Sequence, residues 1–405
     1  MTQRIAIVGS GPGGLMAADQ LLNKGFRVSL FERRGAIGRK LFVAGSSGLN
    51  ITNSAEITEF AEAYSGQNLS FWLSILGDFS PTDWTSFIET QLDQETFLGT
   101  SGRYFIKSKT AVKFVRNWRD RLTKLGCQFF LNHELSQLQI ESQLTPPTLP
   151  ITIQLQFKNR EHQVFDAVIL ALGGGAWETE YPIPWPQLFS PFEIQVQDFE
   201  PSNVGWEMRL GPDFFKEAEG LPLKNIVFSS VKGCKKGDLV VTSYGLEGTP
   251  IYRLGAAQIC YIDLKPDLSH TELLKKLTRV KENLSPLRRV KKSLNLSKAA
   301  EALLFHSLKG NPILSLESLA EFIKKVPVEL TRPRPLSESI SSTGGLSFQT
   351  LDDNFMIKSM PGVFVTGEML DWDAPTGGYL IQGSVSLARA AAKGVQKYLT
   401  NPNQT

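Results

Sequence analysis

A glycine-rich turn between two short apolar runs is the feature that most constrains how this chain can fold. Residues 4–8 form an apolar run of the kind that makes a buried parallel strand. Residues 9–14, Gly-Ser-Gly-Pro-Gly-Gly, follow directly, and residues 15–22 have the composition of a helix. A second apolar run, 26–31, ends at Glu32. The order strand, glycine turn, helix, strand and acidic residue predicts a dinucleotide-binding unit.

The residues of this turn have separate physical tasks. Gly9 permits a tight turn, Gly11 lets a pyrophosphate approach the backbone, and Gly14 lets the helix pack closely against the strand. Pro12 and Gly13 complete the turn before the helix at 15–22, whose N-terminus faces the phosphates with free N–H groups and the positive end of its dipole. These five residues are therefore the first predicted cofactor contacts. The alternative is a glycine-rich turn in an α/β protein that binds no ligand.

Glu32 and the basic segment after it refine the ligand. Glu32 lies 18 residues after Gly14, where its carboxylate can accept hydrogen bonds from both ribose hydroxyls and would repel a 2′-phosphate. The sequence therefore predicts FAD or NAD rather than NADP. Arg33, Arg39 and Lys40 lie in the segment that follows. This segment either runs along the cofactor and neutralises its pyrophosphate, or forms a solvated basic loop.

Composition excludes several other kinds of protein. A chain of 405 residues with 41% hydrophobic and 20% charged residues suggests two domains of ordinary composition. Its cysteines, Cys127, Cys234 and Cys260, form no C-x-x-C pair, and its histidines show no ligand spacing, so no metal site is expected. No apolar stretch approaches the ~18–20 residues of a membrane span, and no leader precedes residue 4. We therefore expect a cytoplasmic protein with no membrane partner.

Two further segments carry a family resemblance. Residues 38–41 are Gly-Arg-Lys-Leu, residues 44–45 are Ala-Gly, and residues 50–53 are Asn-Ile-Thr-Asn. Together they resemble the signature of the BaiN-like, or aminoacetone-oxidase-like, family of FAD-binding flavoproteins. The sequence departs from that pattern at Gly48 and Leu49, where the family typically has arginine and cysteine. The departure indicates a distinct subfamily that keeps the FAD scaffold and need not use the family's thiol.

The resemblance extends to candidate contacts in the middle of the chain. The stretch around Asn50 is rich in small residues and hydrogen-bond donors, which suits close approach to a flat ring. Residues 99–108 resemble a family segment that lies near the flavin, which makes Arg103 and Tyr104 candidate catalytic or substrate contacts. An apolar run at 165–172 opens onto Gly173 and Gly174. In two-dinucleotide-type flavoproteins a motif of this kind returns the chain to the cofactor.

The C-terminal motif is the most specific resemblance. Residues 367–382 match the family pattern G-E-x-L-D-x-x-x-P-T-G-G-Y-x-x-Q almost completely. Glu368 can accept hydrogen bonds from ribitol hydroxyls. The helix that follows the glycine pair can direct backbone N–H groups at the pyrimidine edge of the flavin, where negative charge develops on reduction. The motif predicts cofactor contacts and one candidate catalytic residue, Asp371; the predicted contacts are Gly367, Glu368, Gly377, Gly378 and Tyr379.

The domain organisation follows from composition and this resemblance. Five prolines between 182 and 201 mark an exit from the first domain. We predict a Rossmann-like, two-dinucleotide-type FAD domain of the α/β class from residues 1–190 and 337–405, an inserted β-barrel-like domain at 191–270, and a small helical sub-domain at 271–336. Within the β domain, 237–248 resembles a family turn. Tyr244 there is either a proton or hydrogen-bond donor to a substrate, or a structural tyrosine.

The predicted helical sub-domain is strongly basic. Residues 271–298 hold nine basic residues, against two acidic ones, Glu272 and Glu282; the basic residues are Lys275, Lys276, Arg279, Lys281, Arg288, Arg289, Lys291, Lys292 and Lys298. A surplus of this size can attract a polyanion such as RNA. The alternative, which the sequence favours, is a solvated helical cap whose lysine side chains cover apolar surface.

Three functions are compatible with these motifs. The first is an FAD-dependent oxidoreductase that moves a hydride between flavin N5 and a small-molecule substrate. Because only one dinucleotide fingerprint is present, NAD(P)H would have to enter the flavin pocket itself as a transient reductant, or another electron donor must serve. The second is a flavoenzyme that acts on RNA, recruited by residues 271–298. The third is an FAD-binding protein that senses redox state or passes electrons to a partner.

Overall fold

The computed structural model describes residues 3–45, 48–108, 110–142, 151–178, 183–280, 284–309 and 315–400. The chain divides into two compact units, which are residues 1–200 with 341–405, and residues 201–340. We describe each unit by itself. No helix among the described residues has both the length and the apolar character needed to cross a bilayer.

The first unit is built on a parallel sheet with the strand order β19-β10-β1-β2-β6. Its strands are β1 Arg4–Val8, β2 Arg27–Glu32, β6 Gln128–Leu131, β10 Ala167–Leu170 and β19 Val363–Val365. The central strands are apolar because they are covered on both faces, and every described residue of β10 is buried. The order places the two ends of the chain in one sheet, since β19 joins β10 beside β1.

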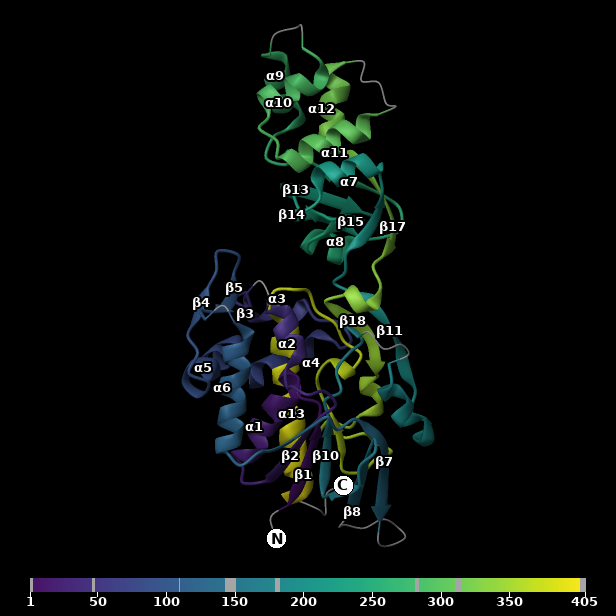
Figure 1. The fold of residues 1–405 in the computed structure, drawn as a ribbon. Helices are drawn as coiled ribbons and strands as arrows, with labels where there is room; N and C mark the ends of the chain where they lie inside the picture. The colour runs from purple at the N-terminus through teal and green to yellow at the C-terminus, as the bar shows by residue number, and fades with distance from the viewer. Residues whose placement is uncertain are drawn as a thin grey trace. The chain divides into compact units, whose positions relative to one another are not determined.

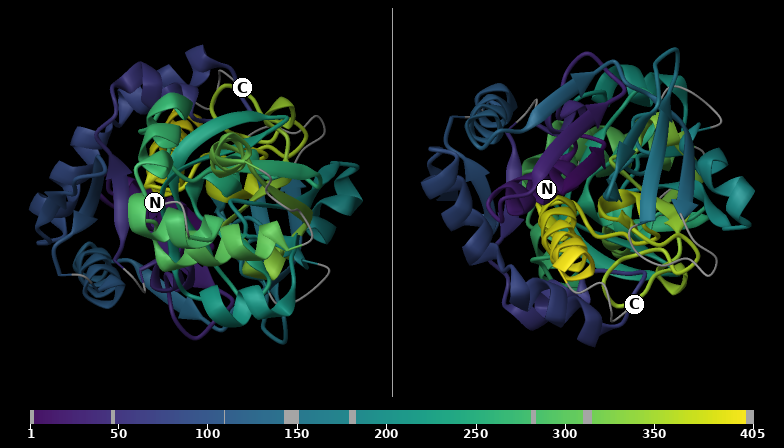
Figure 2. Two further views of the ribbon diagram at one scale, coloured as in Figure 1. Left: turned by 90° about the horizontal axis from the view of Figure 1, so that it is seen from above. Right: turned by 90° about the horizontal axis from the view of Figure 1, so that it is seen from below.

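Helices cover one face of this sheet. These are α1 Pro12–Leu22, α6 Ala111–Lys124 and α13 Tyr379–Thr400. Helix α13 packs against α1 and against the strands β10 and β19. It is the long yellow helix in the view from below (Figure 2, right). Leu15 of α1, Trp118 of α6 and Val385 of α13 share one core with Ile7 of β1. The apolar residues of α6 recur at three- and four-residue steps and form its buried face.

Smaller elements of the first unit surround this layer (Figure 1). Two short antiparallel sheets contribute β3 Asn50–Asn53, β4 Thr96–Leu98 and β5 Arg103–Ile106, and β7 Leu135–Ser142, β8 Ile151–Phe157 and β9 Gln163–Phe165. A further two-stranded sheet consists of β11 Val196–Ser202 and β18 Ser341–Leu346. The remaining helices are α2 Arg39–Ala44, α3 Ile57–Glu62, α4 Leu69–Asp78, α5 Pro81–Gln91, and the 3-10 turns η1 Trp185–Phe192, η3 Phe348–Thr350 and η4 Gly367–Met369. Strands β7, β8 and β9 form an antiparallel meander, each pairing with the next.

The second unit is a closed six-stranded barrel with attached helices. Its strands are β12 Trp206–Arg209, β13 Pro222–Ser230, β14 Gly233–Val241, β15 Gly245–Glu247, β16 Ile259–Asp263 and β17 Val326–Pro333. Its helices are α7 Pro212–Ala218, α8 Thr249–Leu254, α9 His270–Thr278, α10 Pro286–Ser293, α11 Lys298–Leu308 and α12 Leu316–Lys324, and a 3-10 turn, η2 Leu336–Glu338, follows β17. The barrel and helices share one apolar core, in which Phe228 and Leu303 are fully buried.

The predicted fold class is confirmed, because a Rossmann-like parallel sheet and an inserted barrel with helices are both present. The unit boundaries lie at 200/201 and 340/341 rather than at the predicted 190/191 and 336/337, since β11 pairs with β18 and extends the first unit. Residues 271–336 were predicted to be helical, but their last part, 326–333, forms the strand β17. This strand closes the barrel between β16 and β12, so the alternating pattern at 326–333 is a strand signal.

Candidate functional site

The glycines of the N-terminal turn have different surroundings. Gly9 and Gly14 are packed tightly against backbone, and Gly11 borders open space. A methyl group built on Gly9 would lie 2.1 Å from the carbonyl oxygen of Ala171, and one on Gly14 would lie 2.0 Å from that of Gly9. Both positions therefore need glycine for backbone packing. Gly11, the N-cap of α1, has an ordinary φ of −72°, and a methyl group there would meet nothing within 4 Å. Space therefore lies open beside the first turn of α1, whose N-terminus no side chain caps among the described residues.

The glycine turn also meets the C-terminal motif. A methyl group on Gly13 would lie 3.6 Å from the Cα atom of Gly367 and 3.6 Å from the Thr366 side chain. Gly367 has a φ of +77°, and a methyl group there would meet nothing within 4 Å. The two motifs predicted to hold the cofactor are thus adjacent, with open space beside one glycine of each.

The Glu32 carboxylate, at the end of β2, is oriented by hydrogen bonds from Ser10 in the glycine turn and from the backbone of Arg34. One carboxylate oxygen, Oε2, accepts a hydrogen bond from the Ser10 amide at 3.2 Å and another from the Ser10 hydroxyl. The other, Oε1, accepts from the amide of Arg34 at 2.9 Å. A carboxylate has about four acceptor positions, so capacity for about one ribose hydroxyl remains. Ser10 was not among the predicted contacts, although its place between two fingerprint glycines could have indicated it.

Three arginines surround a buried carboxylate that the sequence did not single out. The Glu178 side chain is 7% exposed and forms an ion pair with Arg33; the guanidinium groups of Arg34 and Arg39 lie 3.5 and 3.6 Å from it. Burial raises the pKa of the Glu178 carboxyl, but the hydrogen bond and charge of Arg33 and the charges of Arg34 and Lys40 outweigh burial and hold the pKa below its usual range. Glu178 is therefore ionised at neutral pH, and it already neutralises part of the basic segment.

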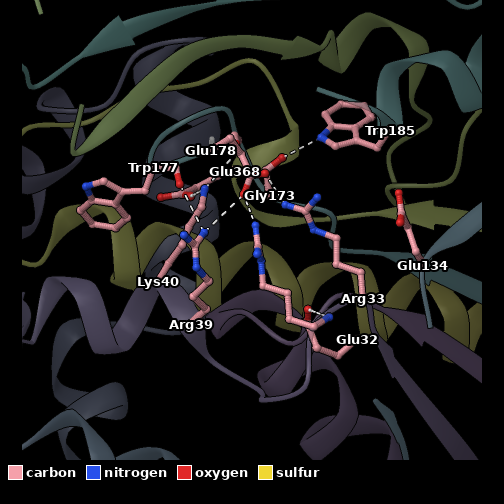
Figure 3. Close-up of polar contacts among 12 residues, drawn as sticks. Glu32, Arg33, Arg39, Lys40, Glu134, Gly173, Trp177, Glu178, Trp185 and Glu368 are labelled. Atoms are coloured by element: carbon pink, nitrogen blue, oxygen red, sulfur yellow. Dashed lines mark hydrogen bonds and ion pairs between the residues drawn. The ribbon is translucent and has the colours of Figure 1, made fainter. Parts of the chain in front are cut away.

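Lys40 connects the basic segment with two distant parts of the chain. Its Nζ atom donates to the carbonyl oxygen of Gly174 at 3.0 Å and to Glu368 Oε2 at 3.2 Å. Figure 3 shows Arg33, Arg39 and Lys40 extending from one segment toward the loop that carries Glu178. In the same loop, Gly173 has a φ of +80°, and a methyl group there would lie 3.6 Å from Lys40 Nζ. The structure thus brings together the predicted contacts Arg33, Arg39, Lys40, Gly173, Gly174 and Glu368.

The glycine pair of the C-terminal motif lies against β3 and β5. Gly377 and Gly378 have φ values of +116° and +95°, which favour glycine. A methyl group on Gly378 would lie 2.4 Å from the amide nitrogen of Thr52, and one on Gly377 would lie 3.2 Å from Arg103 Nε. Asn50 is in the same strand as Thr52. Tyr379 opens α13 and stacks on Phe60 with ring centroids 4.3 Å apart.

The candidate catalytic residues have different surroundings. Arg103 lies beside Gly377, as described above, whereas Tyr104 pairs with Thr52 and packs partly buried against the core. Asp371 Oδ1 accepts a hydrogen bond from the amide of Gly344 at 3.0 Å, which gives this carboxylate a role in ordering the backbone. Only Arg103 of these three is therefore placed among the predicted cofactor contacts.

Tyr244 lies in the second unit and is already engaged there. Its hydroxyl donates a hydrogen bond to Glu247, and the Arg334 guanidinium lies 4.4 Å from the centre of its ring. Burial raises the pKa of Tyr244, and the Glu247 carboxylate adds to the rise. The phenol therefore stays protonated through the neutral range, held by an internal acceptor.

Gly48 and Leu49, where the sequence departs from the family pattern, have structural roles. Leu49 is 1% exposed and belongs to the main core of the first unit, and Gly48 has a φ of +113°. Position 49 therefore supplies packing rather than a thiol. Burial raises the pKa of the Cys127 thiol to about 12, so this cysteine is not a reactive thiolate either.

Comparisons with known proteins find matches over nearly the full length of the chain. A family model described as "HI0933-like protein Rossmann domain" matches residues 3–394. A protein of Haemophilus influenzae named "Ribosomal RNA dihydrouridine synthase" is 23% identical over 411 residues, covering 96% of this chain and 98% of that protein.

Solved structures with a similar fold include a 3-ketosteroid delta1-dehydrogenase from Sterolibacterium denitrificans, with a TM-score of 0.52, 12% identity, and coverage of 97% of this chain and 99% of that chain. A flavocytochrome c3 fumarate reductase has a TM-score of 0.52 at 13% identity, with 98% and 78% covered. At such identities the likeness concerns the fold alone.

Proposed function

The chain belongs to the HI0933-like Rossmann-domain family of FAD-binding flavoproteins, and from this premise we propose that it is an FAD-dependent oxidoreductase acting on a small organic substrate. The observation that carries the proposal is the meeting of two glycine motifs from opposite ends of the chain. Gly11 and Gly367 each border open space, and Gly13 approaches the Cα atom of Gly367. When bound, FAD would supply hydride transfer at its N5 atom.

The residues present fit this cofactor. The uncapped N-terminus of α1 beside Gly11 suits a pyrophosphate, whose charge the first N–H groups and the helix dipole stabilise. Glu32, held by Ser10, would accept from a ribose hydroxyl. The cations Arg33, Arg34, Arg39 and Lys40 outnumber their carboxylate partners Glu178 and Glu368, so net positive charge remains along the same edge. Gly367 borders open space that would admit the ribitol, and the Gly377–Gly378 pair, held against β3 and β5, would present its backbone to the flavin ring.

The protein's own contribution would be orientation and electrostatic tuning. Lys40 and Glu368 neutralise one another at 3.2 Å, so their polar atoms are held in fixed positions. Arg103, beside Gly377, is the proposed substrate contact. NADH or NADPH is proposed as the reductant that enters the same pocket.

The proposal is tested by following the visible spectrum of the purified protein under anaerobic conditions. We expect a flavin spectrum that NADH or NADPH bleaches within seconds to minutes. A flavin that neither coenzyme reduces would exclude a nicotinamide reductant and favour amine oxidation or electron transfer to a partner. If the protein binds no flavin even after FAD is added back, the proposed function is wrong.

RNA is a second proposed substrate class, and two observations favour it. The H. influenzae relative, aligned over nearly its whole length, has a name that specifies ribosomal RNA. Residues 201–340 contain 22 basic and 15 acidic residues, whereas the rest of the chain contains 21 and 25. The positive charge surplus is thus confined to the second unit. An RNA-acting flavoenzyme would use this unit for binding.

The structure corrects the predicted basic surface at one residue. Arg289 is buried, and its Nη1 atom donates to the carbonyl oxygens of Leu277 and Val280 at 3.3 and 2.7 Å. It therefore stabilises the end of α9 and is not available to RNA. Lys281 lies outside the described residues. The exposed cations of α9, α10 and the adjoining segments are Lys275, Lys276, Arg279, Arg288, Lys291, Lys292 and Lys298.

Charge reversal distinguishes an RNA-binding surface from a solvated cap. We expect the quadruple replacement by glutamate of Lys275, Lys276, Arg288 and Lys292 to abolish RNA binding at low salt. With about 0.7 counterions released per contact, these four contacts should account for about 3 units of the wild-type log–log salt slope. The measurement is filter binding of ribosomal RNA fragments over a salt series.

The matched control reverses four exposed cations of α6 in the first unit, Lys113, Arg116, Arg119 and Lys124. This variant should keep RNA binding. Equal losses in both variants would indicate non-specific attraction to net charge. Absence of any affinity in the wild-type protein at low salt would eliminate the RNA hypothesis.

A further inference from the structure

The connection between α3 and α4 is tied to the loop that precedes α13. Residues 63–68 form this connection, and residues 370–378 form the loop. The amide of Ser65 donates to the carbonyl oxygen of Asp373 at 2.9 Å, and the Ser65 hydroxyl accepts from the Asp373 amide at 3.1 Å. A methyl group on Gly66 would lie 2.2 Å from the carbonyl oxygen of Asp371. The two segments are therefore in backbone contact.

Tyr64 extends this contact into the first turn of α13. Its hydroxyl donates to the carbonyl oxygen of Tyr379 at 2.7 Å, and the backbone of Gly383 also hydrogen-bonds to the phenol. The phenol oxygen therefore contacts the backbone of the first turn of α13 at two residues. A methyl group on Gly383 would lie 2.7 Å from the Tyr64 ring, so glycine at this position makes the approach possible.

Aromatic packing holds the phenol in place. The Tyr64 ring stacks on Trp72 with centroids 4.3 Å apart, and the Trp372 ring lies 5.8 Å away. The Trp72 indole donates to the carbonyl oxygen of Ser65 at 3.2 Å, and the Trp372 indole donates to that of Gly367 at 2.9 Å. Tyr64 is thus connected to both ends of the C-terminal motif.

We propose that Tyr64 is a positioning residue for the bound flavin, because it sets the orientation of the peptides at Gly377, Gly378 and the first turn of α13. This inference rests on the proposed FAD site, in which those peptides face the pyrimidine edge of the ring. Tyr64 itself does not touch the cofactor. It acts through the carbonyl oxygen of Tyr379.

The phenol is well suited to this task, since its proton stays on the oxygen. Burial raises the pKa of Tyr64 well above its usual range, the Tyr379 phenol adds to this rise, and the Gly383 backbone opposes it. The oxygen therefore donates to Tyr379 throughout the physiological pH range. A constant donor gives the helix start a constant geometry, which matters because preorganised dipoles stabilise developing charge without rearrangement.

The direction of the expected effect follows from the charge on the ring. Reduction places negative charge near the pyrimidine edge, and N–H dipoles directed there stabilise the reduced form more than the oxidised form. Loosening these peptides should weaken that preference and lower the flavin midpoint potential. The affinity for oxidised FAD should change less, because oxidised flavin carries no such charge.

The test is the midpoint potential of bound FAD in the holoprotein, measured for wild type and Tyr64→Phe. Phenylalanine keeps the ring stack and removes only the hydroxyl. We expect a tenfold loss of the preference for reduced over oxidised flavin, which is about 30 mV for a two-electron couple. Ser65→Ala, which removes the exposed hydroxyl contact with Asp373, should lower the potential in the same direction by a smaller amount.

Tyr398→Phe is the matched control, because it removes a buried phenol oxygen from the other end of the same helix, one without a partner among the described residues. Its potential should equal that of wild type. An unchanged potential in Tyr64→Phe, or an equal shift in Tyr398→Phe, would overturn the inference while the proposed function stands. If Tyr64→Phe does not fold, an unchanged potential in Ser65→Ala would overturn it. Absence of FAD from the wild-type protein would refute the proposed function instead.

Discussion

Replacement of Gly11 by aspartate is expected to abolish FAD binding and leave the fold intact. A side chain at this position meets no atom within 4 Å, and the backbone φ of −72° suits any residue. Aspartate is also a good N-cap, so α1 should gain a few tenths of a kcal/mol of stability. The carboxylate, however, would occupy the helix N-terminus that the pyrophosphate needs and would repel its charge. The affinity for FAD should fall by at least about 100-fold.

This prediction is checked by titrating the apoprotein with FAD and recording thermal unfolding of each variant. The matched control is Gly77→Asp, which adds the same charge at another open helical glycine, in α4. The control should bind FAD as wild type does. Undiminished FAD binding by Gly11→Asp would show that the pyrophosphate does not lie at the start of α1.

Replacement of Arg121 by methionine is expected to destabilise the first unit by about 3–5 kcal/mol at neutral pH, because it leaves a buried charge without its partner. The Asp19 side chain in α1 is 1% exposed, and its Oδ2 atom accepts from Arg121 Nε at 2.6 Å. Its Oδ1 atom accepts from Asn23 at 2.8 Å. Methionine retains most of the side-chain volume, so the loss should reflect the charge rather than a cavity.

The effect of Arg121→Met should depend on pH. Burial raises the pKa of Asp19 in the folded protein, and the hydrogen bond and charge of Arg121 oppose this rise. Without Arg121 the folded pKa rises further above the unfolded one. Such a group contributes stability at pH values below its unfolded pKa and loses that contribution as the pH rises through the folded pKa. The destabilisation should therefore shrink as the pH is lowered from about 8 toward 5.

Urea unfolding at several pH values measures this dependence. The double variant Asp19→Asn/Arg121→Met removes both charges and should recover most of the lost stability, because a neutral pair tolerates burial. A loss in Arg121→Met that is independent of pH, or one that the second replacement does not recover, would indicate that packing rather than charge stabilises this contact.

Much of the fold could be predicted because its signals are local. Strands β1 and β2 and helix α1 follow from apolar runs separated by glycines, and α6 follows from its apolar period. The barrel was harder, since β17 lies far from β12 and β16 in sequence and pairs with both. The alternating pattern of a short strand shows which of its faces is apolar, but it does not show with which other strand it pairs.

The candidate site could be predicted only in part, for a related reason. Glycines at Gly9, Gly14 and Gly378 are required by the backbone at their own positions, and such a requirement is visible in a motif. The partners of charged side chains are chosen by packing between distant segments. Glu178 between arginines and Arg289 at the end of α9 are examples, since neither place follows from sequence spacing.

The sequence by itself determined the Rossmann-like unit, the acidic residue at the end of β2 and the C-terminal glycine motif, because each depends on backbone conformations and periodicities within a short stretch. Only the tertiary structure decided that Ser10 orients Glu32, that Lys40 joins Gly174 to Glu368, and that Tyr64 enters the first turn of α13. The physical reason is that a side-chain hydrogen bond requires atoms within about 3 Å. Distances of this kind arise only when segments far apart in the chain pack against one another.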